Sequence, residues 1–270
     1  MSRYPWSTRP NHARKFLCSP GRYVDTGGAL VEAPLAFWGE WEAPSYVYKC
    51  WPKEGELPRF LHEPAWEHPK INGFRQNTDP WVFGDRFRYS NCFQTKPISK
   101  TDSRRRETAL QHLTKGLLIL FGSKSAAGGF ALDTVIVVSE ELQRFRPTAP
   151  PEIDEAFRVC TIESLEAGGD RNTQFTLYSG ATYESPINGM YSFVPSRRAN
   201  HDGFRFARPA ISLAGEPIKG HLQSPKGAST PRSPEQIRAC WESVREQVCA
   251  KDCLIGVHFA TPLLDDANAQ

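Results

Sequence analysis

The segment from Gln76 to Gln94 interleaves hydrogen-bonding side chains with aromatic rings. A flexible linker would not need the aromatic residues, and a plain core strand would not need so many carboxylates and amides. The mixture is typical of a pocket that stacks a flat ring and reads its edge with amide and carboxylate groups. We expect Asp79 or Asp85 to act there as an acid or base. The residues of this segment expected to bind the substrate are Asn77, Trp81, Arg86, Tyr89, Asn91 and Gln94.

The side-chain types predict individual roles within this pocket. Trp81 or Phe83 would stack on the flat ring, and the amides of Asn91 and Gln94 would read its edge. A simpler interpretation of the polar start of the segment stays open, in which residues 77–79 only form a turn before a proline.

Two further segments carry groups suited to a binding site. If residues 38–42 are extended, Glu40 and Glu42 point to the same side of the strand. Carboxylates beside indole rings can serve as an acid or base, so Glu40 is a third catalytic candidate, although most exposed glutamates have no such role. Arg171, in the polar stretch Asp170–Gln174, is a further candidate for binding the substrate.

Arginines gather in two places, although 33 Lys and Arg against 30 Asp and Glu leave a formal charge of only +3. This balance excludes a strongly basic, histone-like protein. Arg104, Arg105 and Arg106 are consecutive, and Arg197 and Arg198 begin a second basic stretch with aromatic residues in it. Such stretches can follow a phosphate backbone, so these five arginines are candidates for binding nucleic acid. A solvated loop neutralised by nearby acids is the alternative.

The cysteines and histidines, seven of each, are scattered along the chain. Cys249 and Cys253 are the only close cysteine pair, and a zinc site usually needs a second pair, so we expect no metal. Cys92 is a candidate nucleophile because Asp85 and Arg86 are near it in sequence. An ordinary buried thiol is the alternative. For Arg86, pairing with a surface carboxylate, together with the simple turn at 77–79, is the alternative. The sequence indicates no particular cofactor.

The chain has no apolar run of the roughly 18 residues that a membrane-spanning helix needs. Residues 1–6 also lack the apolar stretch of a secretory signal. We therefore expect a cytoplasmic protein with reduced thiols and no membrane partner. Its oligomeric state cannot be predicted from the sequence.

The elements that must position these groups are mostly strands, because 22 prolines and 20 glycines leave little room for long helices. Leu117–Phe121 and Leu132–Val138 are rich in apolar or β-branched residues and are predicted to be neighbouring strands. The pieces Gly28–Glu32 and Leu35–Gly39 are each long enough for a short strand only.

Two helices are predicted. Ser233 can cap a helix that begins at Pro234, and Ile237, Cys240, Trp241, Val244 and Val248 then recur at helical spacing. A shorter helix is predicted after Thr101–Ser103, through the arginine triplet to Leu113. The expected fold class is mixed α+β, with a largely antiparallel, twisted or barrel-like sheet, a few short helices and one longer C-terminal helix. Residues 1–146 and 152–270 form two regions or one continuous domain.

Taken together, the segments 38–45, 77–94, 116–138 and 189–195 resemble nucleotide-modification-associated domain (Nmad-like) proteins, found in phage and bacterial DNA modification and defence loci. The resemblance implies a nucleotide or modified-DNA context without assigning a catalytic residue. The block 116–140 is also similar to one strand pair of PUA-like folds, small barrels that often read modified bases.

Two classes of function therefore remain open, with a third beside them. The first is a protein that binds a nucleotide or a nucleic-acid base through the segment 77–94. Such a protein either only binds its ligand or is an enzyme that acts on the nucleotide or modified base. The second is a non-catalytic, PUA-like reader of modified DNA that uses its arginines to contact phosphates. The third is a defence or toxin protein whose partner is another protein, for which the sequence offers no specific feature.

Overall fold

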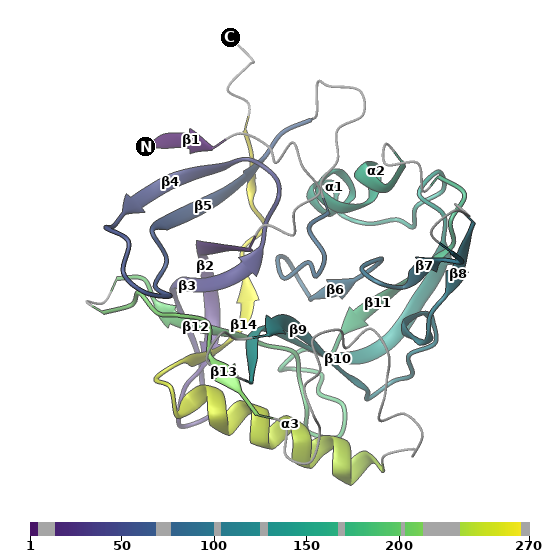
Figure 1. The fold of residues 1–270 in the computed structure, drawn as a ribbon. Coiled ribbons are helices and arrows are strands. Elements are labelled where there is room, and N and C mark those ends of the chain that lie inside the picture. Colours follow the sequence, from purple (N-terminus) through teal and green to yellow (C-terminus); the bar gives the residue numbers. More distant parts are fainter. Residues whose placement is uncertain are drawn as a thin grey trace.

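The computed structural model describes residues 1–4, 14–68, 77–99, 104–124, 129–166, 171–200, 203–212 and 233–265. These residues form the mixed α+β fold predicted from the sequence, with mostly antiparallel strands and few helices (Figure 1). Strands from residues 1–146 and from 152–270 pair with each other in both larger sheets.

The larger sheet closes into a barrel because one cycle of antiparallel pairs returns to its starting strand. The strands of this cycle, each paired with the next and the last with the first, are β2 (Arg14–Val24), β3 (Leu30–Glu40), β12 (Val194–Arg198) and β14 (Leu254–Phe259). The sheet continues beyond β2 through β5 (Phe60–Trp66) to β4 (Ser45–Cys50) and β1 (Ser2–Tyr4), and β15 (Leu263–Leu264) also pairs with β5. The pieces predicted as two short strands are the single strand β3, so that prediction is wrong.

The second sheet is built around the long strand β10 (Phe130–Phe145). β10 pairs with β9 (Leu118–Lys124), which confirms the two strands predicted as neighbours. Its other partners are β11 (Phe175–Gly180) and β13 (Ala210–Ile211), and β6 (Arg88–Tyr89) pairs with β11.

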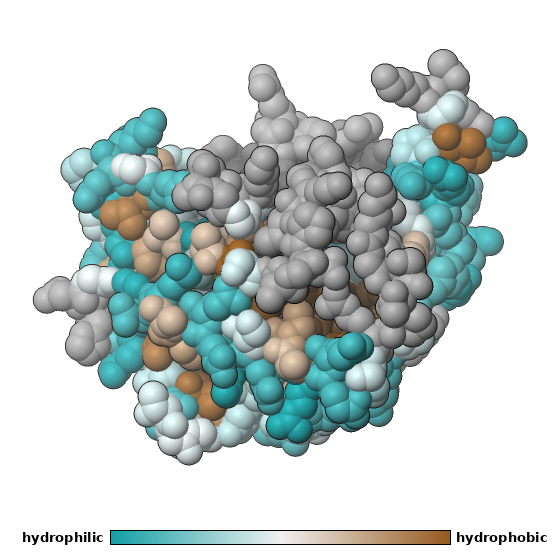
Figure 2. All heavy atoms as spheres, turned by 60° about the horizontal axis from the view of Figure 1, so that its bottom comes forward, coloured by the Kyte–Doolittle hydropathy of each residue, from teal (hydrophilic) through white to brown (hydrophobic). Residues whose placement is uncertain are grey.

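The third sheet is a two-stranded ribbon, and it replaces the helix predicted through the arginine triplet. β7 (Thr95–Pro97) pairs with β8 (Arg105–Glu107), and only a 3₁₀ turn follows at Ala109–Gln111. Cross-strand pairing outweighs the local helical preference here, as tertiary contacts often do. The predicted cap at 101–103 lies outside the described residues. Figure 2 shows that the right-hand side of the molecule, where β7 and β8 lie in Figure 1, is largely hydrophilic.

The predicted C-terminal helix is α3 (Pro234–Cys249), which lies along the bottom of the molecule in Figure 1. Ser233 caps it reciprocally with Gln236, as expected for a serine before a helix-starting proline. Trp241, Val244 and Val248 are buried, while Ile237 and Cys240 are only half-buried, so the predicted apolar face is confirmed in part. The remaining helical turns are consecutive, at α1 (Glu155–Phe157), the π-turn Arg158–Ile162 and α2 (Glu163–Leu165).

Within the described part of the chain, no helix has both the length and the apolar character that a membrane crossing requires.

Four of the five aromatic residues of the segment 77–94 are buried in the core, and only Phe93 is exposed. Trp81 is fully buried, with its ring 6.0 Å from Trp41 of the barrel and 5.5 Å from Phe157 of α1. Phe83 lies 5.3 Å from Trp81 and 5.3 Å from Trp41. These rings join the barrel to the helical turns, and their burial leaves no face on which a ligand could stack.

Replacing Trp81 by alanine should therefore destabilise the fold by about 3–5 kcal/mol, as expected for truncating a large core side chain. Tyr48, which is 54% exposed, is the matched control, and Tyr48→Ala should change stability by about 0.5 kcal/mol or less. Denaturant unfolding measures the free energy of unfolding of both variants, and the slope of free energy against denaturant concentration should match that of the wild type. Equal losses in the two variants would contradict the core assignment of Trp81.

Candidate functional site

Six charged side chains gather where the barrel meets the loop before β6 and the strand β10. We call this group the charged cluster, and its members are Arg14, Lys15, Glu40, Glu42, Asp79 and Asp133. All four carboxylates are buried, each with less than a tenth of its residue surface exposed. Burying charges is costly even when they are paired, so such a group is more than the stability of a fold requires.

Arg14 holds one end of the charged cluster. Strand pairing places Arg14 opposite Glu40, with 3.8 Å between its guanidinium and a Glu40 carboxylate oxygen. The Nε of Arg14 also forms a close ion pair with Asp133, whose other partner is Arg208 at 3.4 Å. Burial raises the pKa of Asp133, while both arginines act to lower it. Arg14 thus links the end of β3 to β10.

Lys15 forms the other end, beside a buried serine and a buried histidine. Its Nζ donates to the carbonyl of Ala43 and to Ser45 Oγ, both at 3.1 Å, and Ser45 Oγ lies 3.1 Å from Nδ1 of His62. Burial lowers the pKa of Lys15 to about 8, which the charge of Glu42 only partly offsets. Burial, with Lys15 nearby, also lowers the pKa of His62 to about 4, so this imidazole is neutral at pH 7.

Glu42 connects Lys15 to the start of the predicted segment. Its carboxylate accepts a hydrogen bond of 2.7 Å from the backbone N–H of Asn77, and its own N–H donates to Thr78 Oγ1. The buried amide oxygen of Asn77 has no hydrogen-bond partner among the described residues. A buried acceptor without a partner is costly, and a ligand N–H is one group that could satisfy it.

Asp79 shapes the turn that follows β6. Its carboxylate accepts three backbone N–H bonds, at 3.0 Å from Ser90, 2.9 Å from Asn91 and 2.6 Å from Cys92. Burial raises the pKa of Asp79 to about 6, although these three bonds act to lower it. With no exposed surface, Asp79 can only act through the groups that it positions.

The turn held by Asp79 also places the Cys92 thiol near buried carboxylates. Burial, with the charges of Glu40 and Asp79, raises the pKa of the Cys92 thiol well above its usual range. A thiol that keeps its proton is a poor nucleophile. The structure therefore favours the ordinary buried thiol over the nucleophile.

The three segments singled out in the sequence do not converge on one pocket. Glu40 is buried in the charged cluster, whereas the side chains of Asp85 and Arg171 are 65% and 63% exposed. Asp85 pairs with Arg88 at 3.1 Å, and its carboxylate is also 3.4 Å from Arg86. Arg171 pairs with a glutamate at 2.8 Å. Pairing of Arg86 with a surface carboxylate is the simpler interpretation left open above.

The other predicted substrate-binding residues serve as internal supports. Gln94 bonds both backbone groups of Thr176, at 2.7 Å and 2.8 Å, so its amide cannot also read a base edge. The hydroxyl of Tyr89 donates to the carbonyl of Cys92 at 2.6 Å, and the amide of Asn91 donates to Ser90 Oγ at 2.8 Å. Together they hold the turn that Asp79 shapes.

The predicted nucleic-acid-binding arginines divide into two kinds. The guanidinium of Arg197 donates to three backbone carbonyls, of Lys251, Asp252 and Gly203, and so supports the turn after α3. Arg198 is half-buried at the end of β12. Arg104, Arg105 and Arg106 are exposed on the ribbon of β7 and β8. Of these, Arg105 also donates to Thr95, to its Oγ1 at 2.7 Å and to its carbonyl at 3.3 Å.

Five residues in or beside the charged cluster were not predicted from the sequence: Arg14, Lys15, Ser45, His62 and Asp133. One signal was present in the sequence, since Asp133 is a lone charge in an otherwise apolar run, Leu132–Val138. A lone buried charge needs a partner from elsewhere in the chain. The other four residues are ordinary in their local sequence and become candidates only through their contacts.

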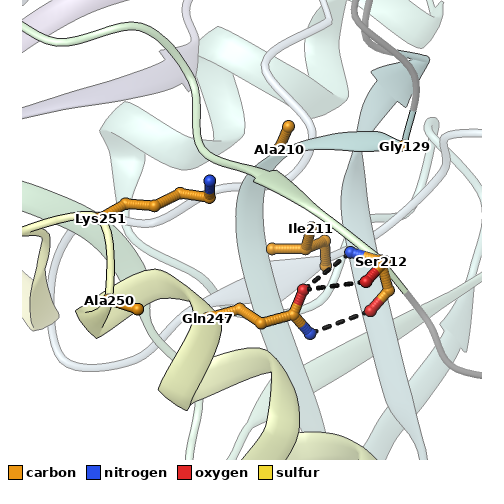
Figure 3. Close-up of a pocket in the computed structure, with 7 residues that line it drawn as sticks. All are labelled: Gly129, Ala210, Ile211, Ser212, Gln247, Ala250 and Lys251. Carbon is orange, nitrogen blue, oxygen red and sulfur yellow. Dashed lines mark hydrogen bonds between the residues drawn. The ribbon is translucent and has the colours of Figure 1, made fainter.

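A hollow of about 450 Å³ lies away from the charged cluster, between β13 and the end of α3 (Figure 3). The amide of Gln247 points to Ser212 and bonds both of its backbone groups, at 2.8 Å and 2.9 Å. Lys251 lines the opposite side. Because the Gln247 amide is already engaged, we assign this hollow no chemistry.

Within the described ranges, no group of three or more His, Cys, Asp or Glu side chains is arranged to hold a metal ion. Comparison with protein-family models, with curated proteins and with solved structures finds no match to this chain.

The raised pKa of Asp79 makes a prediction about stability. Because the carboxyl titrates near 3.8 when unfolded and at about 6 when folded, stability should fall as pH rises between these values and then level off. The free energy of unfolding of the wild type minus that of Asp79→Asn should drop by about 2 kcal/mol from pH 4 to pH 7, because part of the unfolded carboxyl is already ionised at pH 4.

Denaturant unfolding at both pH values measures this difference. Asn91→Ala changes the same turn without removing a carboxyl, so its difference from the wild type should not follow this titration. Should Asp79→Asn fail to fold, the carboxyl carbon shift of Asp79 in the wild type, followed by NMR, reports the same titration. A midpoint below pH 4.5 would contradict the assignment.

Proposed function

We propose that this protein binds a nucleotide, or a base within nucleic acid, at the charged cluster and acts on it by acid–base chemistry. The single observation that carries the proposal is the pair of shifted groups in one buried site. Burial lowers the pKa of Lys15 to about 8 and raises the pKa of Asp79 to about 6. Groups whose pKa values are moved toward neutrality by burial are concentrated at functional sites.

Lys15 is the group proposed to exchange a proton with the substrate. With a pKa of about 8, it loses its proton far more easily than an exposed lysine. Its two hydrogen-bond partners among the described residues are a carbonyl and a hydroxyl, so no carboxylate there accepts its proton. Glu42, whose charge acts on Lys15, is the proposed second group of the reaction.

The neighbouring groups support a base as the ligand. A buried amide oxygen on Asn77 and the carboxylates of Glu40 and Glu42 are hydrogen-bond acceptors, and exocyclic amino and ring N–H groups of bases are donors. Arg14 supplies a planar cation of the kind that pairs with phosphate. The resemblance to nucleotide-modification-associated domains points to the same class of ligand.

Asp79 has a different place in this proposal from the catalytic role predicted for it. Its oxygens are taken up by the backbone of the turn 90–92, so it is a positioning residue. Glu40 stays a catalytic candidate, since it lies in the charged cluster beside Arg14. Asp85, on the surface, would not take part.

A binding panel tests the proposal. We expect at least one member of a set of nucleosides, nucleotides and short oligonucleotides to bind the wild type in calorimetric titrations. Lys15→Met and Glu42→Gln should each weaken that binding by about tenfold, as expected when one charged or hydrogen-bonding partner is lost. Arg171→Gln, which alters an exposed pair away from the charged cluster, should leave it unchanged.

Mass spectrometry of the bound ligand after incubation shows whether the protein is an enzyme or only binds its ligand. A changed ligand whose rate of conversion rises with an apparent pKa near 8 in the wild type supports the acid–base role of Lys15. Binding without any chemical change would leave a non-catalytic reader. If no member of the panel binds, or if both variants bind like the wild type, the proposal is wrong.

A further inference from the structure

The ribbon of β7 and β8 carries a concentration of exposed positive charge. Its exposed cations are Lys96, Arg104, Arg105 and Arg106, of which Arg105 donates back to Thr95 Oγ1 at 2.7 Å. The one acid on its strands, Glu107, is engaged by His112 at 3.1 Å and Arg144 at 3.7 Å. The ribbon is therefore strongly basic in a chain whose net charge is small.

Strand register decides which of these cations share a face. Lys96 lies directly opposite Arg106, and Thr95 lies opposite Glu107. Thr95 is buried, so its face turns toward the protein, and the alternate residues Lys96 and Arg106 turn away from it. We call this side the outer face. Like charges directly opposite each other destabilise a strand pair, so an outer face of this kind is better explained by an anionic partner than by stability.

The segment 77–94 anchors this ribbon to the core. Gln94 bonds both backbone groups of Thr176 in β11, and its own carbonyl accepts a hydrogen bond of 2.9 Å from the N–H of Thr108, just after β8. The hydroxyl of Thr108 also donates to the carbonyl of Phe93 at 2.8 Å. The start of β7 and the end of β8, which together form the base of the ribbon, are thereby tied to the core, so the paired strands are held in a defined orientation.

We infer that the outer face of the ribbon binds the phosphate backbone of double-stranded DNA, with the strand pair lying along the major groove. The major groove of B-form DNA admits a two-stranded ribbon, whereas the major groove of A-form RNA is too deep and narrow. Ile98, which is 49% exposed beside the paired strands, offers an apolar contact of the kind that thymine methyl groups accept. This inference rests on the proposed function only in taking nucleic acid as the ligand.

Salt dependence is the signature of such a surface. Each phosphate neutralised by a cation contributes about 0.9 to the slope of log affinity against log salt concentration. The double variant Lys96→Gln/Arg106→Gln removes the two cations that face each other across the ribbon. It should lower the magnitude of the slope by about two and weaken binding by about tenfold or more at physiological salt.

The experiment measures fluorescence anisotropy of a labelled 20-base-pair DNA duplex, titrated with the full chain at several salt concentrations. Arg238→Gln is the matched control, because Arg238 is an exposed arginine on α3 with 57% of its side chain accessible. We expect the control to bind like the wild type. Thermal unfolding of both variants checks that these exposed substitutions leave the fold intact.

Further arms of the experiment distinguish other partners. Tighter binding to duplex RNA, to single-stranded DNA or to vesicles containing anionic lipid than to duplex DNA would overturn the inference. So would an unchanged affinity and slope in the double variant.

Failure of this inference can be told apart from failure of the proposed function. The double variant leaves the charged cluster intact, so it should still bind whichever mononucleotide the wild type binds. Lys15→Met should show the opposite pattern, with weakened mononucleotide binding and an unchanged salt slope on duplex DNA. If only the inference about the ribbon is wrong, the double variant keeps the salt slope of the wild type on duplex DNA, while Lys15→Met still weakens mononucleotide binding.

Discussion

The carboxylate of Asp79 is the group on which both the charged cluster and the ribbon of β7 and β8 depend. It is fully buried and accepts three consecutive backbone N–H bonds, so it determines the turn 90–92 that follows β6. Cys92, in this turn, lies near the charges of the cluster. The chain after the turn continues through Gln94 into the ribbon. Because burial disfavours the charged form of Asp79, the fold sacrifices stability at neutral pH to hold this turn. That sacrifice is reasonable for a residue that organises a site.

The charged cluster and the ribbon divide two physical tasks between them. Inside the protein, a low dielectric shifts the pKa of Lys15 toward neutrality, which suits proton transfer but not capture of a large anion. On the ribbon, exposed cations keep their charge and act at longer range, which suits attraction to phosphate. The acid–base site proposed for a base and the basic surface proposed for a phosphate backbone would be complementary parts of one function, and each could be disrupted without the other.

Several features of the fold could be predicted because they depend on local pattern. The β-branched runs of β9 and β10 are typical of neighbouring strands, and Ser233 with Pro234 marks the start of α3. The helix expected through Arg104–Arg106 was wrong because backbone bonds to β7 outweigh local preference there. The segment 77–94 was singled out for its mixture of polar and aromatic residues. Its interpretation as an open pocket was the part that burial overturned, since Trp81 and Gln94 are engaged inside the protein.

The sequence by itself determined the fold class, the strand pair of β9 and β10, and the capped start of α3. Only the tertiary structure decided which charged groups meet. Arg14 and Asp133 are more than a hundred positions apart, and their ion pair exists because β2 and β10, from different sheets, come together in the folded chain. The same packing removes Asp79 from water and leaves Asp85 in it. Burial and long-range contact set the chemistry of each carboxylate, and neither is encoded in the residues next to it.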